Sequence, residues 1–251
     1  MLELGLIFSG IIISTISMAI GIGGGILWTP LLILAYGLSP QEAIATSLFI
    51  QITGLGSGTF AYFKAKLIHL RLSVILSVIA LPGVIVGSYM TVNLPEHTVQ
   101  MILGIMAMIL AILFVVSNEE TETLNNVSLD AAAIRKVAPI PGFFGFLMGF
   151  LSVGISEWLI PALRHKLKLD MPHAIGTSIA MMFILAIISS AMHFNLSGNF
   201  HSEIFILASI GTLIGGQIGA RISQRINDQL LKQSFIYLMT LIGIHLIFQA
   251  I

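Results

Sequence analysis

The sequence predicts an all-α polytopic membrane protein made of two inverted repeats, each a re-entrant or broken helical hairpin followed by three transmembrane helices. Three observations predict this fold class. The composition is strongly apolar, one glycine-interrupted motif occurs twice, and the Lys and Arg residues are confined to a few short connectors. Together these features indicate which segments cross the membrane and which turn back inside it.

The composition indicates that the chain lies in a lipid bilayer rather than in water. Of 251 residues, 57% are hydrophobic and only 9% are charged, against about 25% charged residues in a typical soluble domain. We therefore expect a single membrane domain over 1–251, with repeat 1 at about 1–117, a polar linker at about 118–137 and repeat 2 at about 138–251. The net charge of zero gives no reason to expect a nucleic-acid partner, and the absence of cysteine excludes disulfides and thiolate metal sites.

Apolar segments alternate with short polar connectors along the chain. The segments lie at 4–37, 42–63, 72–92, 98–117, 138–163, 173–194, 203–221 and 230–250. Most match the roughly 20 residues that cross a bilayer as a helix. Segments 4–37 and 138–163 are interrupted, at residues 21–25 and 152–156 respectively. As one helix, 4–37 would be roughly 50 Å long, well beyond a hydrocarbon core of about 30 Å.

The two interruptions are copies of one motif. An offset of 131 residues carries Gly23 onto Gly154, and it carries Ala43-Ile44-Ala45-Thr46-Ser47 onto Ala174-Ile175-Gly176-Thr177-Ser178 without a gap. Glycine weakens a helix and proline removes a backbone donor. We therefore assign the structural breaks to Gly21, Pro30, Gly154 and Pro161. A duplicated, interrupted apolar segment marks the binding site in many membrane transporters.

The basic residues decide whether 138–163 crosses the membrane once or returns to its own side. If it crosses once, five of the eleven Lys and Arg residues face one side and six face the other, which is no bias. If it returns, all eleven lie on one face, as expected from the enrichment of Lys and Arg in cytoplasmic loops. We therefore expect a hairpin at 138–163 and, from repeat symmetry, another at 4–37. The basic loops are then cytoplasmic and both termini face outward.

A helix that begins inside a membrane leaves unpaired backbone N–H groups at the positive end of its dipole, which suits an anion. We therefore expect the substrate to bind at the glycine run and at polar residues near both breaks. The candidates are Gly23, Gly24, Gly25, Thr46, Ser47, Gln51, Ser156, Thr177 and Ser178. No His, Asp or Glu spacing predicts a metal site, and most of the seven histidines are expected at the solvated interface.

Two interpretations are open for several of these positions. Glycines in membrane helices usually serve close packing, which we expect at Gly83, Gly87, Gly145, Gly149, Gly211, Gly215 and Gly219. In the run from Gly21 to Gly25, ligand binding is favoured over packing because the run lies in a duplicated break. Glu157 is either a proton-coupling group or a carboxylate that caps the following half-helix, and the two roles are compatible.

The duplicated pattern resembles the TauE/SafE group of sulfite exporters and related permeases. The resemblance covers the whole chain and rests on Gly21-x-Gly23-Gly24-Gly25-x4-Pro30, on Ala43-x-x-Thr46-Ser47, and on the counterparts Pro161 and Ala174-Ile175-Gly176-Thr177-Ser178. It implies an inner- or plasma-membrane carrier of sulfite or a related sulfur-containing or organosulfonate anion. It also implies that Gly23, Gly24, Gly25, Thr46, Ser47, Thr177 and Ser178 line the pathway. Family members often carry a glycine triplet in both repeats, whereas the second copy here reads Gly154-Ile155-Ser156-Glu157.

The sequence thus predicts a secondary transporter of a small anion that works by alternating access, with Glu157 as the candidate for proton coupling. A passive anion channel of the same architecture is the alternative. An enzyme is not expected, because the chain has no Ser/His/Asp arrangement, no HExxH motif and no cysteine. The expected partners are the small anion and the lipid bilayer, no cofactor is expected, and a homodimer is left open.

Overall fold

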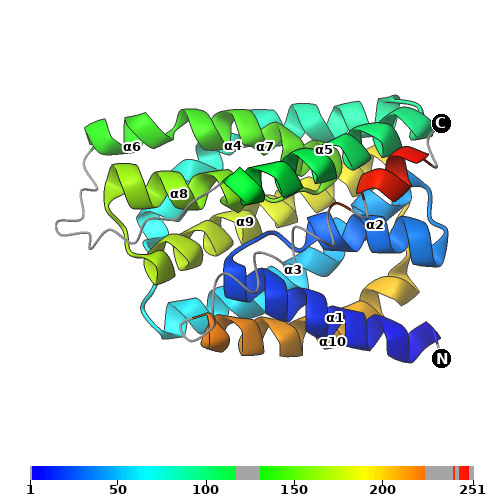
Figure 1. Cartoon of the computed structure of the whole chain (residues 1–251), viewed down its shortest axis with the longest axis horizontal. Helices are drawn as coiled ribbons and strands as arrows, with labels where there is room; N and C mark the ends of the chain where they lie inside the picture. The colour runs from blue at the N-terminus through cyan, green and yellow to red at the C-terminus, as the bar shows by residue number, and fades with distance from the viewer. Residues whose placement is uncertain (1, 117–130, 224–239, 241–242, 249–251) are drawn as a thin grey trace.

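The computed structural model describes residues 2–116, 131–223, 240 and 243–248. Within these residues the chain is helical and contains no strand. The helices are α1 (Leu2–Ile20), α2 (Gly25–Tyr36), α3 (Pro40–Lys64), α4 (Leu70–Asn93), α5 (Glu96–Val116), α6 (Ala131–Val137), α7 (Pro139–Leu151), α8 (Ser156–Leu167), α9 (Met171–Ser197) and α10 (Ser202–Ile222). They lie roughly along one long axis (Figure 1).

Four of these helices, α3, α4, α9 and α10, are long and apolar enough to cross a membrane. Shorter apolar stretches lie in α1, α2, α5 and α7. The predicted segment 230–250 falls mostly outside the described residues, as does most of the predicted linker at 118–137. The end of that linker is helical, because Ala131–Val137 begins with three alanines, which favour helix most strongly.

The predicted break in the first segment is present. Helix α1 ends at Ile20, Gly21 takes a left-handed conformation with φ of 84°, and α2 begins at Gly25. Figure 1 shows α2 running back toward the end of the molecule where α1 begins. At 1.5 Å per residue, α1 is about 28 Å long and α2 only about 18 Å. The first segment is therefore a long helix followed by a returning half-helix.

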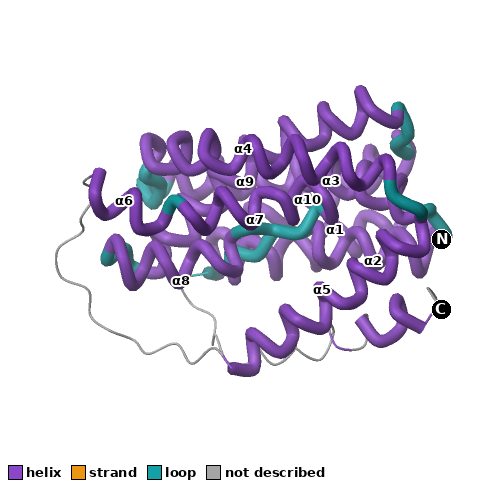
Figure 2. Tube along the Cα trace, turned by 90° about the horizontal axis from the view of Figure 1, so that it is seen from above, coloured by secondary structure: helices purple, strands orange, loops and turns teal. Residues whose placement is uncertain are grey.

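The second segment is broken in the same way. Helix α7 ends at Leu151, Ser152 has a left-handed φ of 62°, and α8 begins at Ser156. Ser152 lies 131 residues after Gly21, so equivalent positions adopt the same unusual conformation. Figure 2 shows non-helical backbone in the middle of the bundle beside α7. Helix α5 lies at the edge of the bundle.

The long helix of each hairpin packs closely on a helix from the other half of the chain. Helix α1 packs on α10, and α7 packs on α4. Glycines make this approach possible, because a Cβ would meet the backbone of the neighbouring helix at Gly83, Gly87, Gly145, Gly149, Gly211, Gly215 and Gly219. The prediction that these glycines serve packing is confirmed.

The remaining contacts define two groups of three helices. The first group contains α1, α3 and α10, and the second contains α4, α7 and α9. Each group mixes the two halves of the chain, and α3 packs against α9 where the groups meet. The half-helices α2 and α8 pack on α3 and α9 respectively. Every contact of the first group thus has a counterpart in the second.

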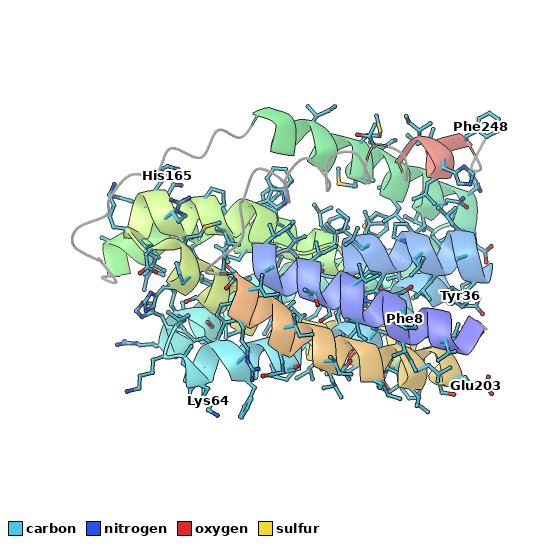
Figure 3. All side chains as sticks on the ribbon, turned by 60° about the horizontal axis from the view of Figure 1, so that its bottom comes forward. Phe8, Tyr36, Lys64, His165, Glu203 and Phe248 are labelled. Carbon is cyan, nitrogen blue, oxygen red and sulfur yellow. The ribbon has the colours of Figure 1, made fainter. Side chains whose placement is uncertain are left out.

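The basic connectors that the structure describes gather at one end. Figure 3 has Lys64 and His165 at one end of the molecule and Tyr36 and Glu203 at the other. Lys166 Nζ donates a hydrogen bond to the carbonyl oxygen of Lys136 at 2.9 Å, so the connectors before α7 and after α8 are adjacent. The returning path of 138–163 brings these basic segments together, as the charge count predicts.

Candidate functional site

The two breaks contact each other inside the bundle. A Cβ on Gly23 would lie 2.8 Å from the Cα of Gly154, and a Cβ on Gly25 would overlap the carbonyl oxygen of Ser152. Gly24 has room, because the nearest atom to its added Cβ would be Cδ1 of Trp28 at 3.4 Å. Gly23 and Gly25 therefore allow the two breaks to approach closely, and Gly24 faces more open space.

A chain of hydrogen bonds joins α3 to the second break. Gln51 Nε2 donates to Ser152 Oγ at 2.5 Å, and the hydroxyls of Ser152 and Ser47 lie 2.7 Å apart. Ser47 in turn donates to the carbonyl oxygen of Ile44 at 2.9 Å and lies 2.9 Å from Thr29 Oγ1. All of these side chains are buried. Ser47 and Gln51 thus lie where α3 meets the second break.

A small cavity of about 10 Å³ adjoins this chain of hydrogen bonds. It is bordered by α1, α2, α3 and α10, and its lining includes Ser17, Gly24 and Gln51. Ser17 is 1% exposed and Gln51 is 3% exposed. Neither Ser17 Oγ nor Gln51 Oε1 has a hydrogen-bond partner within the described chain. A buried polar atom without a partner is costly, so this pair of atoms is a candidate position for a bound water molecule or a ligand.

The start of α2 borders the same cavity at Gly24. The carbonyl oxygen of Gly24 accepts from the N–H groups of Leu27 and Trp28 at 3.1 and 2.9 Å. No side chain caps this helix start, and the first N–H groups of a helix have no intrahelical partner. No Lys, Arg, His, Asp or Glu of the described residues lines the cavity.

The second break also carries buried hydroxyls. Ser156 Oγ at the start of α8 and Ser178 Oγ on α9 are fully buried and have no hydrogen-bond partner among the described residues. Both belong to the expected candidates. Glu157 is the second residue of α8, but its side chain lies outside what the structure describes.

The two candidate threonines are not part of the chain of hydrogen bonds that joins α3 to the second break, and they make contacts that correspond to each other. Thr46 Oγ1 accepts the backbone N–H of His201 at 3.1 Å, and Thr177 Oγ1 accepts the backbone N–H of His69 at 3.2 Å. His201 and His69 are the N-cap residues of α10 and α4. Each threonine therefore joins the start of one long helix to the start of another. Their part in substrate binding stays a prediction.

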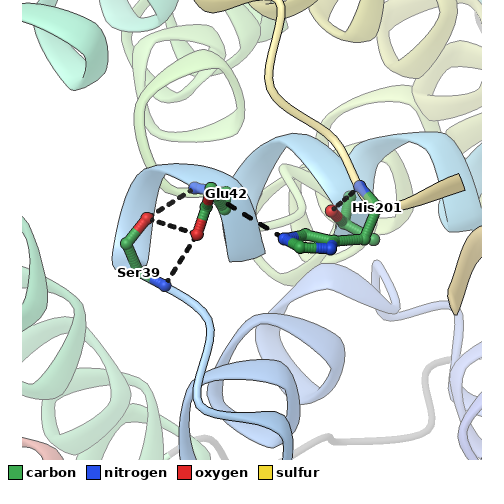
Figure 4. A network of polar contacts seen from close by, with 4 residues as sticks. Ser39, Glu42 and His201 are labelled. Atoms are coloured by element: carbon green, nitrogen blue, oxygen red, sulfur yellow. Dashed lines mark hydrogen bonds and ion pairs between the residues drawn. The ribbon is translucent and has the colours of Figure 1, made fainter.

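Two histidines next to these threonines take part in further polar contacts. His201 Nε2 lies 3.8 Å from Glu42 Oε1, and Glu42 forms a capping box with Ser39 (Figure 4). The ring of His69 lies 5.4 Å from that of His173, which contacts Asp170 at 2.6 Å. Burial lowers the pKa of His69, and repulsion from His173 lowers it further. The nearby Asp170 carboxylate acts in the opposite direction but has the smallest effect.

Some residues of the central cluster and one buried histidine were not predicted. Ser152 occupies the position equivalent to Gly21, so the 131-residue offset could have identified it. Ser17 and Thr29 carry no comparable signal, because a serine or threonine in an apolar helix is common. His193 is 1% exposed, which departs from the solvated position expected for most histidines. No group of three His, Asp or Glu residues that could hold a metal occurs in the described chain.

The apolar spans and the buried polar centre define a multi-pass membrane protein of the transporter class. Over residues 6–246 the chain matches the family described as Sulfite exporter TauE/SafE, and it belongs to this family. The family is thus one of membrane transporters rather than of enzymes.

Three relatives come from Bacillus subtilis (strain 168). The probable membrane transporter protein YunE is 28% identical, covering 98% of this chain and 97% of the relative. YjnA is 25% identical over 98% of this chain and 100% of its own length, and YdhB is 23% identical over 91% and 94%. Both are also named probable membrane transporter proteins. No solved structure matches the chain.

Proposed function

We propose that this protein is a secondary transporter of a small anion, sulfite or a related sulfur-containing anion, and that it works by alternating access. One observation carries the proposal. Two broken segments meet inside the bundle, next to buried hydroxyls and an amide. Two oxygen atoms there, Ser17 Oγ and Gln51 Oε1, have no hydrogen-bond partner in the described chain. Interrupted helices that meet at a polar centre are the sites where membrane carriers bind substrates.

The proposal includes two inverted repeats in a bilayer. Several equivalences at the 131-residue offset support it. Gly21 and Ser152 share a left-handed conformation, and Thr46 and Thr177 accept equivalent backbone N–H groups. The packing of α1 on α10 corresponds to the packing of α7 on α4. Such paired contacts are expected when two copies of one unit face opposite sides of a membrane.

The centre can hold an anion even though no Lys or Arg of the described residues lines its cavity. The start of α2 offers uncapped N–H groups and the positive end of its dipole. Ser17 adds a hydroxyl that can donate, because its Oγ has no partner among the described residues. The choice of sulfite or an organosulfonate rests on the family's description. Binding is assigned to the predicted set Gly23, Gly24, Gly25, Thr46, Ser47, Gln51, Ser156, Thr177 and Ser178, with Ser152 and Ser17 added.

Orientation follows from the charges. The end that carries Lys64 and His165 is cytoplasmic in this proposal, because Lys and Arg are enriched in cytoplasmic loops. A hollow of about 710 Å³ at this end, lined by Arg71 and Arg135 among others, adds positive potential that attracts anions. Both termini then face outward, and the membrane is the inner or plasma membrane. Homodimer formation is not part of the proposal.

Flux measurements on purified protein in liposomes test the proposal and separate a carrier from a channel. We expect sulfite uptake that saturates, that depends on a proton gradient and that falls at least tenfold in Ser152→Ala. Thr98→Ala, a change in the first turn of α5, serves as the control. Flux that rises linearly with concentration and conducts continuously under voltage clamp would identify the alternative, a passive anion channel.

Coupling is tested separately at Glu157. An ionised carboxylate at the start of α8 would repel an anion, so the proposal assigns it a proton during transport. Glu157→Gln is then expected to keep sulfite exchange while losing uptake driven by a proton gradient. Unchanged dependence on the gradient would limit Glu157 to capping the half-helix, which its position near the helix start also favours.

A further inference from the structure

The orientation of the Gln51 amide gives the centre an unusual property. Gln51 Nε2 donates to Ser152 Oγ at 2.5 Å and points toward the carbonyl oxygen of Ser152 at 3.5 Å. Ser47 donates its proton to the carbonyl oxygen of Ile44. Ser152, whose hydroxyl lies 2.7 Å from that of Ser47, therefore donates to Ser47 and has no proton left for Gln51. Turning the amide over would therefore set Gln51 Oε1 against an oxygen that cannot donate to it. The break around Ser152 therefore holds Gln51 with Oε1, an acceptor, directed away from it.

Gln51 Oε1 is buried and has no donor among the described residues. Gln51 belongs to the lining of the cavity that Ser17 and Gly24 also border. No positively charged side chain of the described residues lines this cavity to compensate a second negative charge. An occupant must therefore bring a hydrogen atom for Gln51 Oε1 and can have its remaining charge stabilised by the α2 start.

We propose that the central site selects an oxyanion that carries its own proton, a monoanion such as hydrogen sulfite, and rejects the corresponding dianion. The inference deepens the proposed function and rests on it. The O–H of the monoanion donates to Gln51 Oε1. The other oxygens accept from the hydroxyl of Ser17 and from the N–H groups at the start of α2.

The cavity is smaller than the proposed ligand. About 10 Å³ admits the centre of one water molecule, so in this conformation there is room for one oxygen of the anion but not for the whole anion. The whole anion enters when the two breaks separate, since Gly23 and Gly154 are in contact here. A fully deprotonated oxyanion would set oxygen against Gln51 Oε1, leaving both acceptors without a donor.

The second half of the chain supplies a matched substitution. The position equivalent to Gln51 is Met182, which is buried on α9. Methionine is therefore compatible with this place in the repeat, and Gln51→Met removes the acceptor with little change in side-chain length. Met182→Leu is the control, because it changes the equivalent position without altering the amide.

The experiment measures equilibrium binding to the purified full-length protein in detergent, where no gradient exists. The probes are sulfite, sulfate, which has no O–H at neutral pH, and methanesulfonate, a monoanion without an O–H. Above the pKa of hydrogen sulfite, the apparent Kd for total sulfite is expected to rise about tenfold for each pH unit, because the competent species declines by that factor. Sulfate and methanesulfonate are expected to bind at least tenfold more weakly.

Variants separate this inference from proton coupling. Gln51→Met is expected to lose the preference for hydrogen sulfite, whereas Met182→Leu and Glu157→Gln keep it. An apparent Kd for total sulfite that does not change with pH, or equal binding of sulfate in the unmodified protein, would overturn the inference without a variant. Retention of the preference in Gln51→Met would overturn it too. Failure of sulfite to bind at every pH would instead refute the proposed function itself.

Discussion

Tyr62 Oη donates a hydrogen bond to the carbonyl oxygen of Met18 at 2.8 Å. The 131-residue offset between the two breaks relates this pair to His193 and Gly149. There His193 Nε2 lies 2.8 Å from the carbonyl oxygen of Gly149. Met18 and Gly149 lie in the last turns of α1 and α7, whose carbonyls lack intrahelical partners. In an apolar interior those carbonyls need donors from elsewhere. Two different side chains thus satisfy one requirement of a broken helix.

Removing either donor should therefore destabilise its hairpin. Tyr62→Phe is expected to cost about 1–3 kcal/mol, because a buried carbonyl loses its donor while the ring is kept. His193→Phe is expected to cost at least as much, because the phenyl ring is also larger than the buried imidazole it replaces. Thermal unfolding in detergent measures the effect. Tyr89→Phe is the control, since Tyr89 is 59% exposed. If the three variants unfold at the same temperature, the carbonyls have other donors.

The packing of the breaks predicts opposite results at neighbouring glycines. Gly25→Ala would place its Cβ on the carbonyl oxygen of Ser152, whereas the nearest atom to a Cβ on Gly24 is 3.4 Å away. We expect Gly25→Ala to cost about 1–3 kcal/mol or to prevent folding, and Gly24→Ala to unfold close to the unmodified protein. Yield of monodisperse protein and melting temperature are the measurements. Equal tolerance of both changes would mean that the breaks do not touch.

The environment of His69 predicts a stability that depends on pH. Burial and the neighbouring His173 lower its pKa below the ordinary value of 6.5, so the folded protein binds this proton less readily than the unfolded chain. The contribution to stability is therefore present above about pH 6.5 and is lost as the pH falls through that range. His69→Gln should reduce the fall in melting temperature between neutral and mildly acid buffer. An equal fall in His69→Gln and in the unmodified protein would contradict this prediction.

Much of this architecture follows from patterns in the sequence. The break at residues 21–25 was predictable because glycines and length together disfavour one straight helix over 4–37. The break at 152–156 was predictable because it repeats the same motif 131 residues later. The gathering of Lys136 and Lys166 at one end followed from the charge count. The roles of Gly145 and Gly211 in close packing followed from their spacing.

The contents of the centre were harder to predict, since they depend on which residues of the two halves come together. Gly23 and Gly25 were expected to approach a ligand, yet they lie against the second break. Ser152 joins the cluster through a left-handed backbone. Serine does not itself favour this conformation, and only the correspondence with Gly21 could have pointed to it. The two helix groups could not be predicted either. The 131-residue offset shows which segments of the two halves correspond, but it does not show which helices pack together.

The mixed groups predict which helices move together during transport. Within the second group, a Cβ on Gly145 of α7 would lie 3.1 Å from the Cβ of Ala80 on α4. Between the groups, a Cβ on Gly56 of α3 would lie 3.0 Å from the ring of Phe183 on α9. Under alternating access, α4 and α7 should move as one body, because glycine packing leaves their backbones no room to slide. Helices α3 and α9 belong to different groups and should move relative to each other.

Paired cysteines test this directly, because the chain contains no native cysteine. A short thiol cross-linker between Ile79→Cys of α4 and Gly142→Cys of α7 should leave sulfite flux within about twofold of the reduced protein. Gly142 accepts a side chain, because the nearest atom to its added Cβ would be Ile79 Cγ2 at 3.7 Å. A short thiol cross-linker between Gly56→Cys and Phe183→Cys should reduce flux at least tenfold, with recovery after reduction. Flux that survives this second link would show that transport does not require the α3–α9 contact to open. Loss of flux with the first link alone would place the moving boundary between α4 and α7 instead.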